Sequence, residues 1–303
     1  MRIYRNIFLV ATLVAIASCN TNKKTGSPSA QKKIVFIPGN DSHGVGEHEH
    51  LGGSILLAKL LNENVPGVNA VVTEQGWPVD TTILNDAATI VMYSDGGDRH
   101  MVIPHQDQID RLMKKGVGLV CLHYSVEIPK NNGGDNFLNW IGGYFETGWS
   151  VNPFWTAKFD ALPTHSITRG VQPFEVNDEW YYHMRFQPAN SSLEQILTAL
   201  PPASTLEREE GPHSNNPHVR EAVLERKEAQ TVAWAYTRGD GGRGFGFTGG
   251  HVHKNWMNDD YRKLVLNAII WTAGIDVPAN GINSKTPTIV ELEALQKKPI
   301  AKK

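Results

Sequence analysis

The chain has 303 residues, a formal net charge of -2, 40% hydrophobic residues and 20% charged residues. This is the composition of an ordinary globular protein, and the charges form no basic stripe, so we expect no nucleic-acid partner. Its two cysteines are Cys19 and Cys121. If Cys19 is modified or removed, no internal disulfide can form and the domain must rely on its core.

The N-terminus has the features of an export signal. Arg2 and Arg5 precede an almost wholly apolar run, residues 7–17, which is too short to span a bilayer but suits a signal peptide. The run ends in Ile16-Ala17-Ser18-Cys19, which resembles the bacterial lipobox. The alternative is an ordinary signal peptide that contains a cysteine. We expect residues 1–19 to be a lipoprotein signal peptide, Cys19 to be lipidated, and the chain to be exported and anchored in the bacterial cell envelope, in the periplasm or at the surface.

The remaining boundaries follow from composition. Residues 20–32 are polar and predict a flexible tether, because they cannot bury enough apolar surface to fold. Residues 33–276 predict one large domain. Residues 277–303 contain Pro278, Gly281 and Pro287 and end in a lysine-rich stretch. We expect a loose C-terminal tail there, with one short helix near residues 289–296.

The first half of the domain alternates strand and helix patterns. Strands are predicted at residues 33–37, 70–72, 89–93 and 118–122, and helices at residues 51–61 and 106–115. The strands are continuous apolar runs, as expected when helices cover both faces of a sheet. Alternation at this spacing predicts an α/β fold with a doubly wound, mostly parallel sheet.

The middle of the chain, residues 127–228, is less regular. It is rich in Gly, Pro, Asn and Trp, and we expect long loops with short strands at residues 157–159 and 180–182. So long an irregular stretch inside a compact domain is usually functional. The regular pattern returns with strands at residues 231–236 and 244–248 and a final helix at residues 259–273.

Histidines and carboxylates follow several of the predicted strands. In an open α/β sheet, ligands bind outside the carboxyl ends of the strands, so these side chains are expected to meet there. After the first strand come His43, His48 and His50, after the third comes Asp95, after the fourth comes His123, and after the last come His251 and His253.

Each of these groups has a second interpretation. His48, Glu49 and His50 suit a solvated helix start, because a glutamate there favours the helix dipole. Glycines between residues 44 and 53 suggest a phosphate loop, but their spacing matches neither common nucleotide fingerprint. His123 directly follows a buried strand, where an imidazole is an unusual choice for packing. His251 follows two glycines, which let the backbone turn sharply.

Two histidines and a carboxylate can hold a divalent metal with open positions. Asp178 and Glu179 offer that carboxylate. The spacings form no local motif such as His-Glu-x-x-His, so the metal hypothesis depends on the predicted fold. We expect His123, Glu179 and His251 as catalytic and metal-binding residues, with zinc or manganese as the ion.

The middle segment is also rich in aromatic residues. They are either core residues beneath long loops or part of a sugar-binding cleft, because a flat ring packs on the apolar face of a pyranose. The aromatic residues are Trp140, Trp149, Trp155, Trp180, Tyr181, Tyr182 and Trp256. The residues that we expect to contact substrate are His43, His48, His50, Asp95, Trp180, Tyr181, His183, Arg185 and His253.

Several of these segments together resemble the ThuA-like (trehalose-utilisation) family over roughly residues 33–276. The matching segments are residues 118–123, 165–170, 178–181, 244–251 and 267–274. The resemblance implies a flavodoxin-like sheet, similar to class I glutamine amidotransferases, with long loop insertions. In those enzymes a nucleophilic cysteine lies on the turn after a strand. Here His123 has that position, and Cys121 is expected to be buried inside the strand, so we expect no glutaminase activity.

The family is linked to disaccharide catabolism through 3-keto sugars. The resemblance therefore implies a lyase or hydrolase that acts on a glycoside or 3-keto-glycoside, with a sugar dehydrogenase as a partner. A keto group at C3 acidifies the C2 proton, which a base can remove. His123 would be base or ligand, His251 ligand or acid, and Glu179 ligand or base.

Two rival functions stay open. One is a non-catalytic sugar-binding lipoprotein that serves a partner enzyme or transporter, and the other is a metal-dependent hydrolase with a different substrate. An enzyme requires the histidines and a carboxylate to converge, whereas a binding module requires only the aromatic cleft.

Overall fold

A central seven-stranded sheet organises the computed structural model, which describes residue 1 and residues 31–188 and 192–297. Its strand order is β2-β1-β3-β4-β11-β10-β9. The strands are β1 (Lys32–Pro38), β2 (Val68–Val72), β3 (Ala87–Tyr93), β4 (Gly118–Leu122), β9 (Leu193–Ala199), β10 (Gln230–Thr237) and β11 (Arg243–Phe247). The first five in this order are parallel, and β10 and β9 add an antiparallel edge. Numbered along the chain, the parallel strands have the flavodoxin-like order 2-1-3-4-5, which confirms the predicted fold class.

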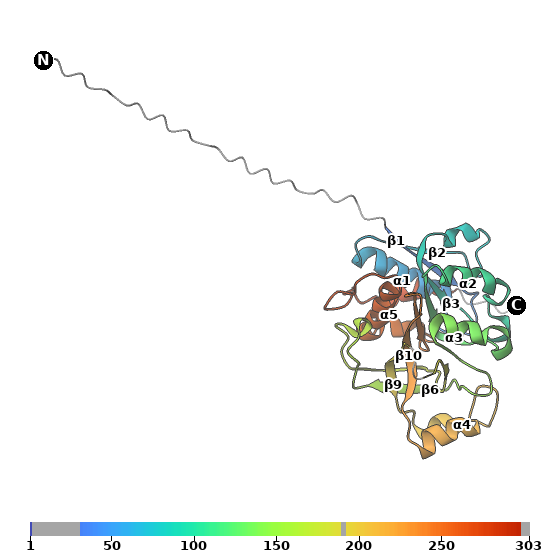
Figure 1. Ribbon diagram of the computed structural model, residues 1–303. Helices are drawn as coiled ribbons and strands as arrows, with labels where there is room; N and C mark the ends of the chain where they lie inside the picture. Colours follow the sequence, from blue (N-terminus) through green and yellow to red (C-terminus); the bar gives the residue numbers. More distant parts are fainter. Residues whose placement is uncertain (2–30, 189–191, 298–303) are drawn as a thin grey trace. The chain divides into compact units, whose positions relative to one another are not determined.

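Helices cover both faces of this sheet (Figure 1). One face carries α1 (His50–Asn64) and α5 (Asp259–Thr272), and the other carries α2 (Gln106–Met113) and α3 (Asp135–Ile141). Side chains alternate along each strand, so in β1 Phe36 packs in the core beneath α1 and α5, while Val35 packs beneath α2 and α3. The central strands β1, β3 and β4 are therefore mostly apolar on both faces.

Local sequence explains where the helices begin and end. The side chain of Asn258 caps α5 by accepting hydrogen bonds from the first backbone N–H groups, and Asp259 and Asp260 favour the positive end of the helix dipole. At the end of α3, Gly142 adopts the left-handed conformation with φ 81°, which stops the helix.

The irregular middle contains two further strand pairings. β6 (Phe154–Phe159) pairs with β7 (Phe174–Glu179), and β5 (Gly143–Tyr144) pairs with β8 (Arg185–Phe186), both antiparallel. The short helix α4 (Pro217–Arg220) lies further along this segment. The strand predicted at 157–159 is the end of β6. The strand predicted at 180–182 is wrong, because β7 ends at Glu179 and the ring of Trp180 turns into the core. β9 was not predicted.

The segment after α5 differs from the expected loose tail. Val277, Ile282 and Leu292 have exposed fractions of 3%, 2% and 0% and belong to the core beneath α1 and α5. The expected short helix is α6 (Ile289–Glu293), whose capping box pairs Thr288 with Glu291. Up to residue 297 the segment packs against the domain, because removing its apolar side chains from water lowers the free energy of the folded chain.

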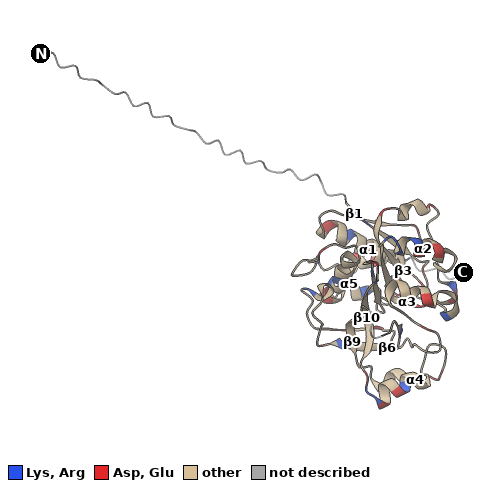
Figure 2. Ribbon diagram, in the orientation of Figure 1, with Lys and Arg blue, Asp and Glu red and all other residues tan. Residues whose placement is uncertain are grey.

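The predicted signal peptide, the lipidation site Cys19 and most of the predicted tether lie outside the described residues. Residues from Gln31 onward form one compact unit. Within the described ranges, no helix is long and apolar enough to cross a membrane. Acidic and basic residues are interspersed along the described ribbon (Figure 2).

Candidate functional site

Three histidines and a glutamate converge at the carboxyl ends of the parallel strands. His48 lies in the loop after β1, His123 directly follows β4, His251 follows β11, and Glu179 ends β7. One ligand atom from each of the four lies within 4.8 Å of the others. We call these residues the histidine–glutamate cluster. They lie beside the topological switch point between β1 and β3, from which the chain connections run toward opposite edges of the sheet. Open α/β sheets bind ligands at this position.

The ring nitrogens of the cluster are unusually close to one another. Nε2 of His48 lies 3.0 Å from Nε2 of His123 and 3.0 Å from Nδ1 of His251. Nε2 of His123 lies 3.2 Å from Nδ1 of His251. Oε2 of Glu179 lies 3.1 Å from Nδ1 of His251 and 3.6 Å from Nε2 of His123. Three imidazoles and one carboxylate therefore face a single point.

The outer partners of two histidines determine which nitrogen carries the proton. Nδ1 of His123 lies 2.9 Å from the carbonyl oxygen of Thr248, which can only accept, so Nδ1 is the donor. Nδ1 of His48 lies 2.7 Å from Oδ1 of Asp95, an acceptor when ionised. In the neutral rings both inner Nε2 atoms then carry lone pairs directed at each other. Such an arrangement is unfavourable unless a cation, or a proton on the neighbouring Nδ1 of His251, lies between the two atoms.

The donor set fits a divalent transition metal. Burial lowers the pKa of His48 to about 4, although the hydrogen bond that its ring donates to Asp95 opposes this, and burial lowers the pKa of His123 well below its usual value. Both rings are then neutral near pH 7, which is the form that ligates metals. Nitrogens bound tetrahedrally to one zinc ion at 2.0–2.1 Å lie roughly 3.3 Å apart. The separations in the cluster are close to this value.

Strained backbone presents two of these histidines. His48 and His123 have φ values of 46° and 55°, in the left-handed region that side chains other than glycine rarely adopt. Each such residue costs on the order of 1–3 kcal/mol, and such strain gathers at functional sites. Because His123 adopts this conformation directly after β4, its imidazole projects from the end of the sheet rather than into the core.

A buried aspartate holds the loop that carries His251. Asp178 accepts hydrogen bonds from the backbone N–H groups of Gly250 and Val252 and from the hydroxyl of Tyr261. Gly250 has φ 111°, which only glycine adopts readily, as the sequence predicted for the paired glycines. Of the two carboxylates considered from the sequence, Asp178 is therefore an anchor and Glu179 is the one that reaches the cluster.

A cavity of about 250 Å³ lies beside the cluster. Tyr181 OH lies 3.3 Å from both Nε2 of His123 and Oε2 of Glu179, and Asn152 donates to Oε1 of Glu179 at 3.2 Å. A molecule in this cavity would contact the cluster and a ring of polar groups. The residues lining this site cavity are His43, His48, Tyr124, Asn152, Glu179, Tyr181, Arg208 and His213.

Other residues expected at the site lie around the cluster, but only some of them line the cavity. The ring of the exposed His43 lies against that of His48, with the centroids 3.7 Å apart and the planes tilted by 38°. Asp95 contacts the outer nitrogen of His48. His50 is fully buried and bonds the carbonyl of Asn40 at 3.0 Å. His253 is also buried and is not among the residues that line the site cavity.

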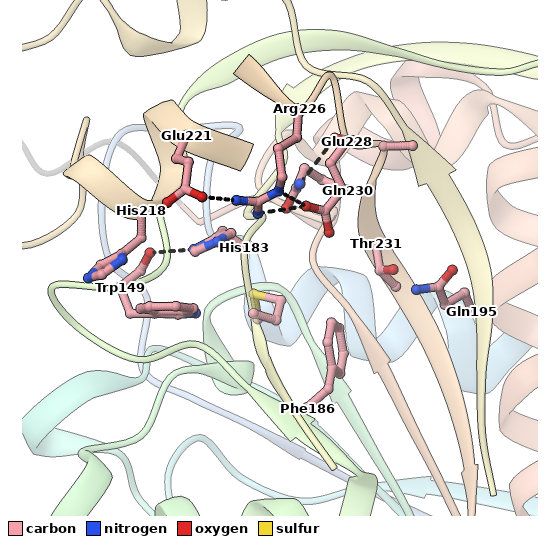
Figure 3. A pocket seen from close by; sticks show the side chains of 12 residues that line it. Trp149, His183, Phe186, Gln195, His218, Glu221, Arg226, Glu228, Gln230 and Thr231 are labelled. Carbon is pink, nitrogen blue, oxygen red and sulfur yellow. Dashed lines mark hydrogen bonds and ion pairs between the residues drawn. The ribbon is translucent and has the colours of Figure 1, made fainter. Parts of the chain in front are cut away.

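Three expected substrate-binding residues lie elsewhere. Trp180 is fully buried against Phe247 and Tyr261. It is therefore a core residue beneath the loops, one of the two roles considered for the aromatic residues, and not part of a sugar-binding cleft. His183 lines a second cavity, of about 320 Å³, where it bonds the carbonyl of Trp149 (Figure 3). Arg185 stacks on Trp149, 3.5 Å from the ring centroid, and pairs with Glu146.

Sequence reasoning missed part of the site. Tyr124, Asn152, Arg208 and His213 line the site cavity but were not predicted there. The long irregular middle segment indicated that function lies in it, but no spacing within it distinguishes His213 from its neighbours. Cys121 is fully buried in β4, as expected, and burial raises the pKa of its thiol far above the usual value.

The fold resembles two solved structures. One is a ThuA-like protein from Bacteroides uniformis ATCC 8492, with a TM-score of 0.56 and 15% identity over 84% of this chain and 96% of that chain. The other is a ThuA-like protein from Parabacteroides merdae ATCC 43184, with a TM-score of 0.52 and 15% identity over 87% of this chain and 99% of that chain. At this identity the likeness concerns the fold alone.

The sequence itself identifies the family. The chain matches no curated protein. Residues 39–272 match the ThuA family, described as trehalose utilisation, and this span includes all four residues of the histidine–glutamate cluster. The chain therefore belongs to the ThuA (trehalose-utilisation) family.

Proposed function

We propose that the domain is a metal-assisted, carbohydrate-processing enzyme that acts on a glycoside or 3-keto-glycoside in disaccharide catabolism. The observation that carries this proposal is the convergence of three imidazole nitrogens within 3.0–3.2 Å of one another beside a cavity. Family membership supports a sugar as substrate. A module that only binds sugar would need neither the facing lone pairs nor the strained backbone that presents them.

The histidines are better suited to hold a cation than to transfer protons. The inner nitrogens of His48, His123 and His251 face one another, so they are not directed at a substrate in the cavity. They would hold zinc or manganese, with Glu179 at the edge of the same site. A bound divalent cation would supply Lewis acidity toward a carbonyl or enediolate oxygen of the sugar.

Glu179 is the candidate base. Its carboxylate lines the site cavity, and Asn152 and Tyr181 hold its two oxygens in place. In a 3-keto-glycoside, Glu179 would remove the proton at C2, which the neighbouring keto group acidifies. The electrons of the C2–H bond then form the enediolate. Cleavage of the bond between C1 and the glycosidic oxygen would yield an enone and an alcohol.

The sugar-binding rival has less support. It requires exposed aromatic platforms, but Trp140, Trp155, Trp180 and Trp256 are all nearly or fully buried. Trp149 is half-buried and lines the second cavity, where Arg185 stacks on its ring. Among the described residues that line the site cavity, the aromatic side chains besides histidine are Tyr124 and Tyr181. Two tyrosines beside three converging histidines suit a reaction site better than a simple sugar platform.

Export and a partner enzyme complete the proposal. The lipobox-like segment ending at Cys19 supports a lipid-anchored protein of the cell envelope, attached to the membrane through that anchor only. A 3-keto-glycoside is the oxidation product of a glycoside, so a sugar dehydrogenase is the class of enzyme that would supply it.

A turnover assay tests the function. The purified chain, supplied with zinc or manganese, is incubated with a 3-keto-glycoside, and release of the alcohol is measured by chromatography. We expect turnover by the wild type, loss of it in His123→Ala, and no change in His105→Ala, a histidine outside the site cavity. Full activity of His123→Ala would show that the assigned site is wrong.

A further inference from the structure

We propose that His213, paired with Glu127, is the general acid that protonates the leaving oxygen of the substrate. This inference rests on the proposed function and adds a residue that faces the histidine–glutamate cluster from a different part of the chain. His213 lies in the middle segment, whereas Glu127 follows the first turn after β4.

The turn that carries His213 is firmly held. Gly211 and Ser214 exchange backbone hydrogen bonds of 3.0 and 3.2 Å, so His213 lies in a tight turn. Its carbonyl accepts from the backbone N–H of Asn152 at 3.1 Å. Its ring stacks on Phe145, with the centroids 5.4 Å apart and the planes at 23°. The imidazole therefore has one defined orientation.

Glu127 sets the charge of that imidazole. Its side chain is 4% exposed, and Oε1 accepts from Nε2 of His213 at 2.9 Å and from Oγ1 of Thr147 at 3.1 Å. A buried carboxylate is costly unless it is paired with a positive charge. The hydrogen bond that His213 donates to Glu127 raises the pKa of His213 above its usual value, although burial opposes this. The pair therefore favours the protonated, acidic form of His213.

The second nitrogen of His213 is available to a ligand. The ring lines the site cavity and its side chain is 33% exposed. Nδ1 has no hydrogen-bond partner among residues 31–188 and 192–297, whereas Nε2 is committed to Glu127. A protonated imidazole with one N–H on a carboxylate and the other facing a cavity is the arrangement that a histidine acid requires.

Acid and base face the same cavity from different elements. Glu179 comes from the end of β7 and His213 from the turn, and no ion pair joins them in the part of the chain that the structure describes. Among the groups that act on the proton of His213, Arg208 lowers its pKa, while Glu127 and Glu179 raise it. The other titratable groups of the cavity are His43, His48, Tyr124 and Tyr181. The two groups therefore lie at different positions around one cavity, as separate acid and base roles require.

The presence of an acid indicates the class of substrate. A sugar alkoxide is a poor leaving group, so the bond between C1 and its oxygen breaks readily only if that oxygen receives a proton. His213 would donate the proton from Nδ1, and Glu179 would have taken the C2 proton. The electrons of the enediolate form the double bond between C1 and C2, and both residues then exchange protons with solvent. An isomerisation without a leaving group would not need this acid.

A comparison of leaving groups tests the role of His213. The full chain is assayed with methyl 3-keto-glucoside, a poor leaving group, and with 4-nitrophenyl 3-keto-glucoside, whose phenolate leaves without a proton. We expect His213→Ala to lose about 10²–10⁴-fold in rate on the methyl substrate and less than about tenfold on the nitrophenyl substrate. His218→Ala, an exposed histidine on the nearby helix α4, is the control and should match the wild type.

The possible results separate the two proposals. If the wild type turns over both substrates and His213→Ala loses the same factor on each, or none on the methyl substrate, the acid role is overturned and the proposed function stands. If the wild type turns over neither substrate, the proposed function fails and the acid role fails with it.

A second measurement does not depend on turnover. The imidazole of His213 is titrated by NMR in the full chain and in Glu127→Gln. We expect a wild-type pKa above the ordinary value of about 6.5, falling by about one unit or more in Glu127→Gln. An ordinary wild-type value that the substitution does not move would overturn the proposal.

Discussion

The carboxylate of Asp95 lies 2.7 Å from Nδ1 of His48, on the opposite side of the ring from the nitrogen that faces the cluster. Outer carboxylates of this kind fix the orientation of a metal-binding imidazole and raise its basicity. We predict that Asp95→Asn weakens metal binding about 10–100-fold, measured by competition with a chelator. Asp98→Asn, a nearby exposed aspartate, is the control. Equal affinity in wild type and Asp95→Asn would contradict the assigned role.

Packing of the C-terminal segment can be measured through helix α6. Leu292 has an exposed fraction of 0%, whereas Ile289 in the same helix is 45% exposed. We predict that Leu292→Ala lowers the free energy of unfolding by about 2–4 kcal/mol, because it leaves a cavity. Ile289→Ala should change it by less than about 0.5 kcal/mol. Urea unfolding checks both, and equal effects would mean that the segment does not pack as described.

The buried, neutral ring of His100 should make the folded protein less stable in acid. Its Nδ1 accepts from the backbone N–H of Val102 and its Nε2 donates to the carbonyl of Ser125, so the buried ring is neutral. Burial lowers its pKa to about 4, while the bond to Ser125 opposes this. The unfolded chain takes up a proton below about pH 6.5 and the folded chain does not, so stability falls as pH drops from 6.5 toward 4.

The size of this loss is testable with one substitution. Between pH 7 and pH 4.5, His100 should account for roughly 2–3 kcal/mol of the fall in unfolding free energy. His100→Gln should be less stable than the wild type at pH 7 but should lose less on acidification. Urea unfolding of both proteins in excess chelator gives the difference without a contribution from metal. Parallel pH dependence in the two proteins would be inconsistent with a neutral, buried His100.

Cys121 should be unreactive in the folded protein. It is fully buried, and the raised pKa of its thiol leaves almost no thiolate at neutral pH. We predict that a thiol reagent labels Cys121 only after urea is added, with the labelled residue mapped by mass spectrometry. Rapid labelling of the native chain would instead reopen the possibility of a cysteine nucleophile.

The sheet could largely be predicted from the sequence, because its parallel strands are continuous apolar runs. β4 is an example, with every residue from Gly118 to Leu122 buried. β9 escaped prediction because Leu193–Ala199 contains Leu, Glu, Gln and Ala, residues that favour helices. It is a strand only because it pairs with β10, and that partner is distant in the sequence.

The candidate site was predicted less completely. His123, Glu179 and His251 could be proposed because the first and last follow predicted strands, and the structure brings all three together. His48 was expected to contact substrate rather than metal, and the alternative for it was a solvated helix start. The pair of His213 and Glu127 spans 86 positions and lies in irregular chain, so neither periodicity nor strand position indicated it.

The most direct test of a metal site is the metal content of the purified full chain, measured by mass spectrometry beside a His123→Ala/His251→Ala double variant. Circular dichroism of both proteins confirms that the variant is folded. We predict close to one divalent ion per wild-type chain and almost none in the variant, because the two substitutions remove two of the three facing imidazoles. No metal in either protein, even after incubation with zinc, manganese and nickel, would contradict the proposal that these histidines hold a cation.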